Sequence, residues 1–254
     1  MKYNFQFSDI IDMKWCLFFR LFFIVSLQST FVRSQPIALV YRGPAACHGC
    51  AESIAALLEG NYTIVYAGPK EKVDVTEETL STAKLYVQPG GGDLDKIWPH
   101  VQEYAKHIRK YVQEGGNYLG TCLGGYLAGT GPGYDLLPGN GQTNQYITSK
   151  GAVITNENDT VVPLFWRGKF RHIYFQDGAR FELDWQAAPT ENLAYYTNGK
   201  IAAAVQHSGK GRVGMVGPHP EANEEWYREY HIKNPDGRLS FDLFYDLLTT
   251  LMAE

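Results

Sequence analysis

Positive charge is scarce in this sequence. It contains 23 lysines and arginines against 27 aspartates and glutamates, and it has no long run of basic residues. A protein that binds nucleic acid needs a basic stripe or patch to neutralise phosphates, and none is present. The sequence therefore excludes nucleic acid as an expected partner.

Other absences narrow the fold and the chemistry. There is no internal repeat, and no linker is long enough to force a second globular domain. The glycine-rich stretch at 89–93 lacks the Gly-Lys-Ser/Thr that would follow in a phosphate-binding loop. Cys47 and Cys50 have no second ligand pair at the spacing of a zinc site. We therefore expect no metal and no cofactor.

The N-terminal segment has the features of a targeting signal. From Met13, a lysine is followed by an apolar run over residues 15–27, and Val32-Arg33-Ser34 suits cleavage by signal peptidase after Ser34. Arg20 interrupts the apolar run, which argues against a membrane-spanning helix of about 20 apolar residues.

We therefore expect residues 1–34 to be a signal peptide, with either Met1 or Met13 as the working start, and residues 35–254 to form a single domain. The mature protein is then expected to be secreted or to lie in the endomembrane lumen, without a stable membrane span. An uncleaved anchor is the alternative.

The composition of the mature chain agrees with secretion. Removing residues 1–34 leaves 19 basic and 25 acidic residues, a formal net charge of −6. Asn61 and Asn158 begin N-x-Thr sequons and are candidate glycosylation sites. Three cysteines remain, and an odd count in an oxidising compartment predicts one bridge plus one free thiol.

Strands and helices alternate through the first half of the mature chain. Apolar runs predict strands at 36–42, 62–67 and 84–87, and a further strand just before Cys122. Helices are predicted between the strands, at 51–58, at 76–80 and along an amphipathic stretch from Ile97 to Val112 with Pro99 in its first turn. This alternation predicts an α/β fold with a doubly wound, mainly parallel sheet flanked by helices.

The pattern changes in the second half of the chain. A loop rich in glycine and proline at 130–142 is followed by short predicted strands and a final helix at 239–252. The turn Asn198-Gly199 predicts a hairpin. We therefore expect an added β-rich segment, with strands at 152–154, 161–166, 170–175, 193–196, 201–206 and 212–216.

The stretch around Cys122 resembles a nucleophile elbow. Gly120 and Gly124 flank the cysteine at the two positions where a side chain would collide if a strand turned abruptly into a helix. Such a turn exposes the sulfur beside the first N–H groups of the helix, which favour a thiolate. The alternative is a buried structural cysteine, since free cysteine packs as a small hydrophobe.

Two further motifs follow predicted strands and are expected at the same edge of the sheet. His219 and Glu221 flank a proline, so His219 can act as a base towards Cys122 while Glu221 orients its ring. The N–H groups of Gly90 or Gly91, together with that of Leu123, can form an oxyanion hole. The alternatives are a solvent-facing histidine and a simple glycine turn.

Other polar and aromatic residues allow two interpretations each. Cys47 and Cys50 form a local disulfide, a redox pair that exchanges with Cys122, or a metal site. The polar pairs of the second half either line a substrate pocket or are exposed strand residues: Arg171-His172 and Gln176-Asp177. We interpret three aromatic residues near the C-terminus as packing residues: Trp226, Tyr227 and Tyr230.

Taken together, these motifs resemble the class I glutamine amidotransferase-like superfamily, which has a flavodoxin-like fold. Within it, the chain resembles the domain at the amino end of fungal biotin–protein ligases and its free-standing relatives. The resemblance covers about residues 36–250 and rests on 41–44, 89–92, 120–126, 165–168, 174–178 and 217–221. It implies Cys122 as nucleophile, His219 as base, Glu221 as orienting residue and Gly90 or Gly91 at the oxyanion hole.

The sequence departs from true glutaminases at one position. Those enzymes commonly carry a glutamine soon after the elbow glycine, where this chain has Gly125-Tyr126, so glutamine is not the expected substrate. Biotin transfer is not expected either. We expect a cysteine-nucleophile hydrolase that acts on a small-molecule or peptide amide. The alternative is a non-catalytic binding or regulatory domain that retains the fold.

Overall fold

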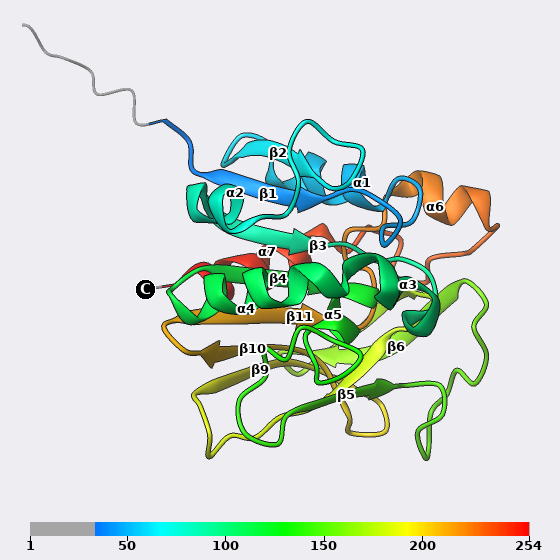
Figure 1. Cartoon of the computed structure of the whole chain (residues 1–254). Helices are drawn as coiled ribbons and strands as arrows, with labels where there is room; N and C mark the ends of the chain where they lie inside the picture. The colour runs from blue at the N-terminus through cyan, green and yellow to red at the C-terminus, as the bar shows by residue number, and fades with distance from the viewer. Residues whose placement is uncertain (1–33, 254) are drawn as a thin grey trace, which may run out of the picture. The chain divides into compact units, whose positions relative to one another are not determined.

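One mixed sheet forms the centre of the fold (Figure 1). The computed structural model describes residues 34–253, so the predicted signal peptide lies outside the described residues except for Ser34. Five neighbouring strands are parallel and stand in the order β2-β1-β3-β4-β11. They are β1 (Ile37–Tyr41), β2 (Thr63–Ala67), β3 (Ala83–Gln88), β4 (Asn117–Thr121) and β11 (Gly211–Val216).

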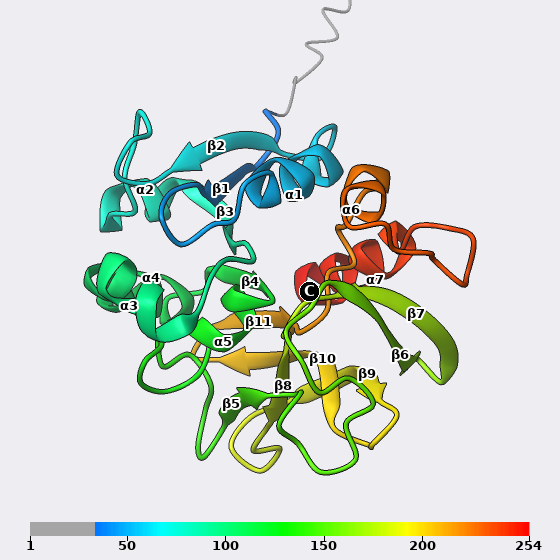
Figure 2. The same cartoon turned by 90° about the vertical axis from the view of Figure 1, so that its right-hand side faces the viewer.

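Helices cover both faces of this parallel half (Figure 2). Ala38 and Val40 of β1 pack in one core with two helices, while Leu39 and Tyr41 point to the opposite core. A strand covered on both faces reads as a continuous apolar run, which is why β1 was visible in the sequence. One face carries α1 (Cys50–Leu58) and α7 (Phe241–Met252), and the other carries α2 (Glu77–Thr82), α3 (Leu94–Val101), α4 (Ala105–Gln113) and α5 (Leu123–Leu127).

Antiparallel strands extend the sheet beyond β11. The order continues β10-β9-β6-β7, while the short strand β8 branches from β10 and pairs in turn with the short strand β5. The predicted hairpin at Asn198-Gly199 joins β9 to β10, with Gly199 at φ +80°. The predicted fold class is therefore confirmed. These strands are β5 (Gln142–Gln145), β6 (Thr160–Trp166), β7 (Lys169–Phe175), β8 (Ala179–Glu182), β9 (Thr190–Tyr196) and β10 (Ile201–Ser208).

The predicted long helix is wrong in one respect. The chain forms α3, a short 3₁₀ turn (Gln102–Tyr104) and α4 in place of one continuous helix, and Pro99 is the sixth residue of α3. A proline inside a helix removes one N–H donor and its ring crowds the preceding turn, so the α-helical ladder breaks soon after it. The apolar periodicity survives the break, because Val101, Tyr104 and Ile108 still pack in one core.

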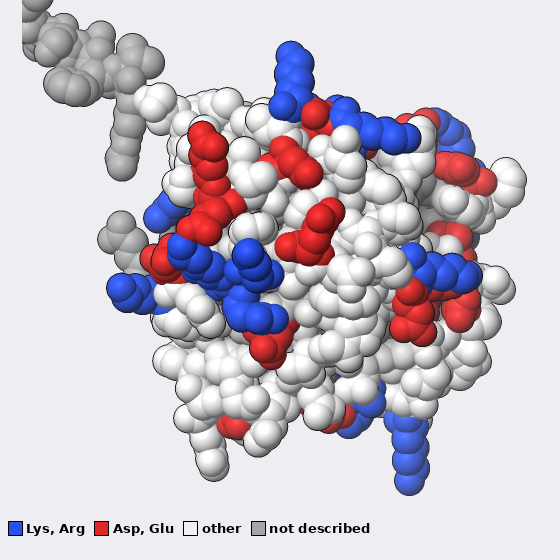
Figure 3. Space-filling model, viewed as in Figure 1, with Lys and Arg blue, Asp and Glu red and all other residues white. Residues whose placement is uncertain are grey.

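Other local predictions also need correction. Residues 152–154 do not form a strand, whereas β5, β8 and α6 (Glu224–Glu229) were not predicted. The two missed strands are four residues long and pair mainly with each other, so neither carries a long apolar pattern. Within residues 34–253, no helix combines the length and the apolarity that crossing a bilayer requires. Charged side chains of both signs are interleaved over the face in Figure 3.

Candidate active site

Cys122 lies at the sharp turn between β4 and α5. Its backbone has φ +49° and ψ −107°, a conformation that side-chain-bearing residues rarely adopt. A Cβ atom at Gly120 would collide with the carbonyl of Gly124, and one at Gly124 would collide with the carbonyl of Gln88. The Cys122 N–H donates to the carbonyl oxygen of Val216 at 2.9 Å. Gly120 is therefore required by the turn itself, as the sequence predicted, and Gly124 by the close approach of β3.

His219 and Glu221 follow β11, the neighbouring parallel strand, and both are almost fully buried. The Nδ1 atom of His219 lies 2.9 Å from Oε1 of Glu221. The same oxygen accepts a hydrogen bond from the Thr121 hydroxyl at 2.9 Å. The main-chain N–H of His219 donates to the carbonyl of Tyr174 at 2.8 Å. The carboxylate of Glu221 thus connects the histidine to the residue that precedes the cysteine.

The electrostatics of His219 link it to Cys122 as well. Burial lowers the pKa of His219, but the charges of Cys122 and Glu221, and hydrogen bonds with both, raise it to about 10. A histidine flanked by two negative groups stays protonated at neutral pH. Glu221 therefore holds the ring through Nδ1 and leaves the opposite ring nitrogen for the reaction.

The loop after β3 supplies the third part of the site. A Cβ atom at Gly90 would lie 2.6 Å from Cε1 of His219 and 3.5 Å from Cβ of Cys122, so only glycine fits there. Among the described residues, no main-chain hydrogen bond uses the N–H of Gly90 or Gly91 as donor. The N–H of Leu123, the first residue of α5, has no preceding helical turn to bond. These donors remain available to a substrate oxygen.

Cys47 and Cys50 form a disulfide, with their Cα atoms 5.3 Å apart. The N–H of Cys47 donates to the carbonyl of Gly90 at 2.9 Å, so the disulfide loop contacts the glycine loop directly. Cys122 is the free cysteine of the described chain. Residues 34–253 contain no group of three histidine, cysteine or carboxylate side chains placed to hold a metal ion.

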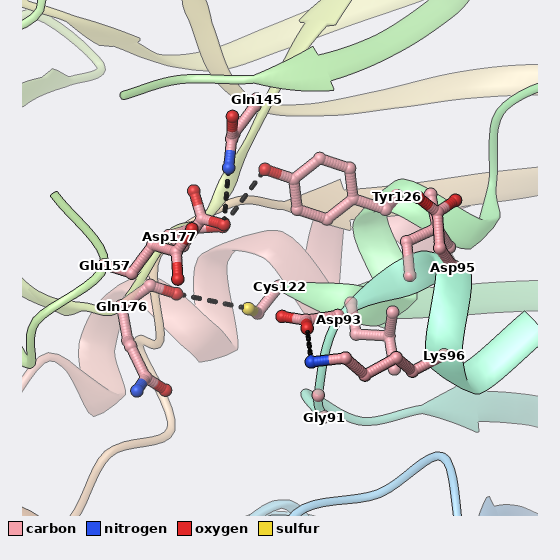
Figure 4. A pocket seen from close by; sticks show the side chains of 13 residues that line it. Gly91, Asp93, Asp95, Lys96, Cys122, Tyr126, Gln145, Glu157, Gln176 and Asp177 are labelled. Atoms are coloured by element: carbon pink, nitrogen blue, oxygen red, sulfur yellow. Dashed lines mark hydrogen bonds and ion pairs between the residues drawn. The ribbon is translucent and has the colours of Figure 1, made fainter. Parts of the chain in front are cut away.

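A pocket of about 570 Å³ opens beside Cys122 (Figure 4). The thiol donates a hydrogen bond to the carbonyl of Gln176 at 3.6 Å. The hydroxyl of Tyr126 donates to the carbonyl of Asp177 at 3.0 Å, and Gln145 donates through Nε2 to Oδ2 of Asp177 at 2.8 Å. Gln176 and Asp177 therefore line this pocket, which was one of their two interpretations. The sequence offered no signal for Gln145.

The other polar pair has a structural role. Arg171 is 6% exposed and pairs with Asp242 and Asp236, and His172 contacts the same Asp236 through its ring and its main-chain N–H. Neither residue lines the pocket beside Cys122. Together they attach the chain before α7 to β7.

A second cavity of about 150 Å³ has His219 in its wall and shares Gly91 and Gln176 with the larger pocket. Trp226 and Tyr230 line it. Trp226 also packs edge to face against Tyr174 and His219, and Tyr227 packs against Tyr174, so the interpretation as packing residues holds for these two. Trp226 and Tyr230 are four positions apart, a spacing that places two side chains on one helical face and was the available signal.

The chain is similar to known proteins in sequence and in fold. Residues 37–136 match the family model described as "Biotin-protein ligase, N terminal". The chain is 30% identical over 224 residues to the biotin–protein ligase of Schizosaccharomyces pombe, an alignment that covers 74% of this chain and 33% of that protein. The chain thus spans about a third of the length of this curated relative.

Solved structures share the fold. The structure of PurLQS from Thermotoga maritima has a TM-score of 0.55 at 21% identity and covers 85% of this chain and 99% of its own. A glutamine amidotransferase from Thermotoga maritima has a TM-score of 0.53 at 14% identity and covers 87% of this chain and 86% of its own. At these identities the likeness concerns the fold alone.

Proposed function

We propose that this chain, which matches the biotin–protein ligase N-terminal family over residues 37–136 and has the fold of a glutamine amidotransferase, hydrolyses an amide through the thiol of Cys122. The observation that carries the proposal is the buried pair of His219 and Glu221, which meets Cys122 beside the unbonded N–H groups of Gly90 and Gly91. The substrate is a small-molecule or peptide amide.

The geometry supports a two-step reaction. The Cys122 thiolate attacks the amide carbonyl carbon, and the resulting oxyanion accepts hydrogen bonds from the glycine loop and from Leu123. Protonated His219 gives its proton to the amide nitrogen, the C–N bond breaks, and an amine leaves behind a thioester. His219 then takes a proton from water, the hydroxide attacks the thioester, and a carboxylic acid is released as the thiolate returns.

The experiment is alkylation of Cys122 by iodoacetamide as a function of pH. We expect rapid labelling to persist well below the ordinary thiol pKa of about 8.5, because protonated His219 stabilises the thiolate. His219→Ala should move the labelling pKa back towards that value. The exposed His100 offers a matched control, and His100→Ala should behave as wild type.

A wild-type labelling pKa near 8.5 that His219→Ala does not change would contradict an activated nucleophile. It would favour the second candidate, a binding or regulatory domain that keeps the elbow as architecture. One observation suits that candidate: the Cys122 side chain is 6% exposed and its thiol is hydrogen-bonded to the carbonyl of Gln176. A biological effect that survives Cys122→Ala would support it.

The proposal also assigns the protein to the secreted fraction or the endomembrane lumen. The Cys47–Cys50 bridge supports this location, because disulfides persist in oxidising compartments. Asn61 and Asn158 support it too, since both sequon asparagines are exposed. A shift in gel mobility on treatment with a glycosidase specific for N-linked glycans tests the assignment, and the double variant Asn61→Gln, Asn158→Gln is its control.

A further inference from the structure

The pocket beside Cys122 is strongly acidic. Four carboxylates from three segments of the chain line it, and they belong to Asp93, Asp95, Glu157 and Asp177. Lys96 is the only lysine or arginine in its lining, and its ammonium group pairs with Asp93. An anionic substrate group would therefore enter a pocket of like charge without a free cation to receive it.

Asp177 is the carboxylate that the structure holds most firmly in this pocket. Gln145 binds one of its oxygens and Tyr126 binds its main-chain carbonyl, while its backbone has φ +48°. The other oxygen, Oδ1, is buried and has no hydrogen-bond partner among the described residues. Burial raises the pKa of Asp177 to about 6, Gln145 opposes the shift, and the charges of Glu157 and Asp93 add to it. This carboxylate lacks a cationic donor.

The smaller cavity beside His219 is also lined by carboxylates, and aromatic rings form part of its wall. Its wall contains Tyr174, Trp226 and Tyr230 together with the carboxylates of Asp159 and Glu229. The rings of Tyr174 and Trp226 meet edge to face, with centroids 5.3 Å apart. Ammonium groups bind against aromatic faces, and nearby carboxylates add to the attraction. No lysine or arginine lines this cavity, and the positive charge of the His219 ring in its wall is opposed by Glu221, whose Oε1 lies 2.9 Å from Nδ1.

We propose that the substrate of this site is an amide that carries a positively charged amine, whose ammonium group is received by Asp177 on one side of Cys122 or by the ring-and-carboxylate wall beside His219. The inference rests on the proposed hydrolase function and names its substrate class. It also gives a physical reason against a zwitterionic amino-acid amide such as glutamine, because the pocket beside Cys122 has no unpaired lysine or arginine to receive the free carboxylate.

The experiment measures how the charge of a thiol reagent changes its reaction with Cys122. Three methanethiosulfonates are compared, carrying a trimethylammonium, a neutral methyl and a sulfonate group. In each reaction the thiolate attacks the sulfenyl sulfur, a mixed disulfide forms and methanesulfinate leaves. Rates are followed by mass spectrometry on the intact protein and divided by each reagent's rate with free 2-mercaptoethanol.

We expect the cationic reagent to react at least about tenfold faster than the anionic one after this correction, because a cleft of one charge sign concentrates the opposite charge. The ratio should fall as salt is added. Asp177→Asn and Glu229→Gln should each lower this ratio, with the charged rates of each variant divided by its own rate for the neutral reagent. Glu225→Gln is the matched control for Glu229→Gln, since Glu225 lies on the same helix outside the cavity.

The outcomes separate the two proposals. Equal corrected rates for the cationic and anionic reagents overturn the charge preference, whatever the neutral rate. A ratio that survives both variants equally overturns the assignment to these carboxylates. The hydrolase proposal is overturned instead if the neutral reagent reacts with Cys122 no faster than with the free thiol and His219→Ala does not change that rate. In that case the ratio of the cationic to the anionic rate still measures the charge preference of the pocket.

Discussion

The residue before the nucleophile is the least expected part of the site. Thr121 is fully buried, and its hydroxyl donates to the same Glu221 oxygen that faces His219. The other oxygen of Glu221, Oε2, has no partner among the described residues. Thr121 therefore acts through Glu221 on the orientation of His219, as a positioning residue.

Thr121→Val tests this role because it keeps the shape of the side chain and removes the hydroxyl. We expect a loss of about 1–3 kcal/mol in the free energy of unfolding, the usual cost of removing a hydrogen bond to a buried charge. We also expect the iodoacetamide labelling pKa of Cys122 to rise, because His219 is less well held. Thr121→Ser restores the hydroxyl and should restore both values. A labelling profile that neither substitution alters would leave Thr121 a packing residue.

Gly90 and Gly92 provide a comparison within one loop. A methyl group at Gly90 would press on the ring of His219, whereas one at Gly92 would meet side-chain carbons of Ile97 at an ordinary 3.7 Å. We expect Gly90→Ala to slow Cys122 alkylation at least about tenfold, since a displaced ring costs the thiolate its counter-ion. Gly92→Ala should react as wild type. Circular dichroism checks that both variants fold, and equal rates would contradict the placement.

At the scale of elements, two loops at the carboxyl edge of the sheet support each other. The disulfide loop between β1 and α1 donates from Cys47 to the carbonyl of Gly90. A Cβ atom at Gly91 would lie 2.8 Å from the carbonyl oxygen of Ala45, so the two backbones are in close contact. The glycine loop is thus held from outside by a bridge that does not touch the thiol itself.

Removing the bridge should therefore weaken the site without removing any of its reactive groups. In the double variant Cys47→Ser, Cys50→Ser, we expect Cys122 to be alkylated more slowly and the labelling pKa to rise, because the loop that carries Gly90 gains freedom. Cys122 is then the only thiol of residues 34–253, so mass spectrometry reads it directly. An alkylation rate equal to that of the wild type would show that the glycine loop keeps its conformation without the disulfide.

At the scale of the whole molecule, a partly buried ion-pair cluster attaches the C-terminal part of the chain to the extended sheet. Arg171 of β7 binds Asp242 and Asp236, and His172 binds Asp236. Burial raises the pKa of Asp236, but hydrogen bonds from His172 and Arg171 hold it below its ordinary value of 3.8. The hydrogen bonds from Arg171 likewise lower the pKa of Asp242.

This cluster predicts how stability changes in acid. A carboxylate with a lowered folded pKa contributes stability that is complete above its unfolded pKa and is lost as the pH falls below it. Asp236→Asn should cost about 1–3 kcal/mol at neutral pH, and the difference from wild type should shrink below about pH 4 as Asp236 protonates. Urea unfolding of both proteins, from neutral pH to below pH 4, measures this difference in the free energy of unfolding. Glu78→Gln, on the exposed face of α2, is the control.

Much of the fold could be predicted from the sequence because it depends on neighbours in the chain. The apolar run of β1 predicted a strand buried on both faces, and Gly120 predicted the elbow through its close contact with Gly124 inside the turn. The break after Pro99 could also have been predicted locally, since a proline at the sixth position of a helix disrupts its hydrogen bonds. The short strands β5 and β8 were not predicted because four residues are too few to show a hydrophobic pattern.

The sequence by itself determined the reactive groups: a cysteine at an elbow, a histidine and glutamate after a neighbouring strand, and a glycine loop, all at the carboxyl edge of a parallel sheet. Only the tertiary structure decided what surrounds them. Gln176 is 54 positions from Cys122 along the chain, yet its carbonyl accepts a hydrogen bond from the thiol. Gln145 and Asp177, which are also far apart in the sequence, are joined by a hydrogen bond between their side chains. The hydrophobic pattern of the sequence does not predict such contacts, because they arise when strands distant in the chain pair with each other. Local sterics therefore specified the nucleophile, and packing specified the charge of its pocket.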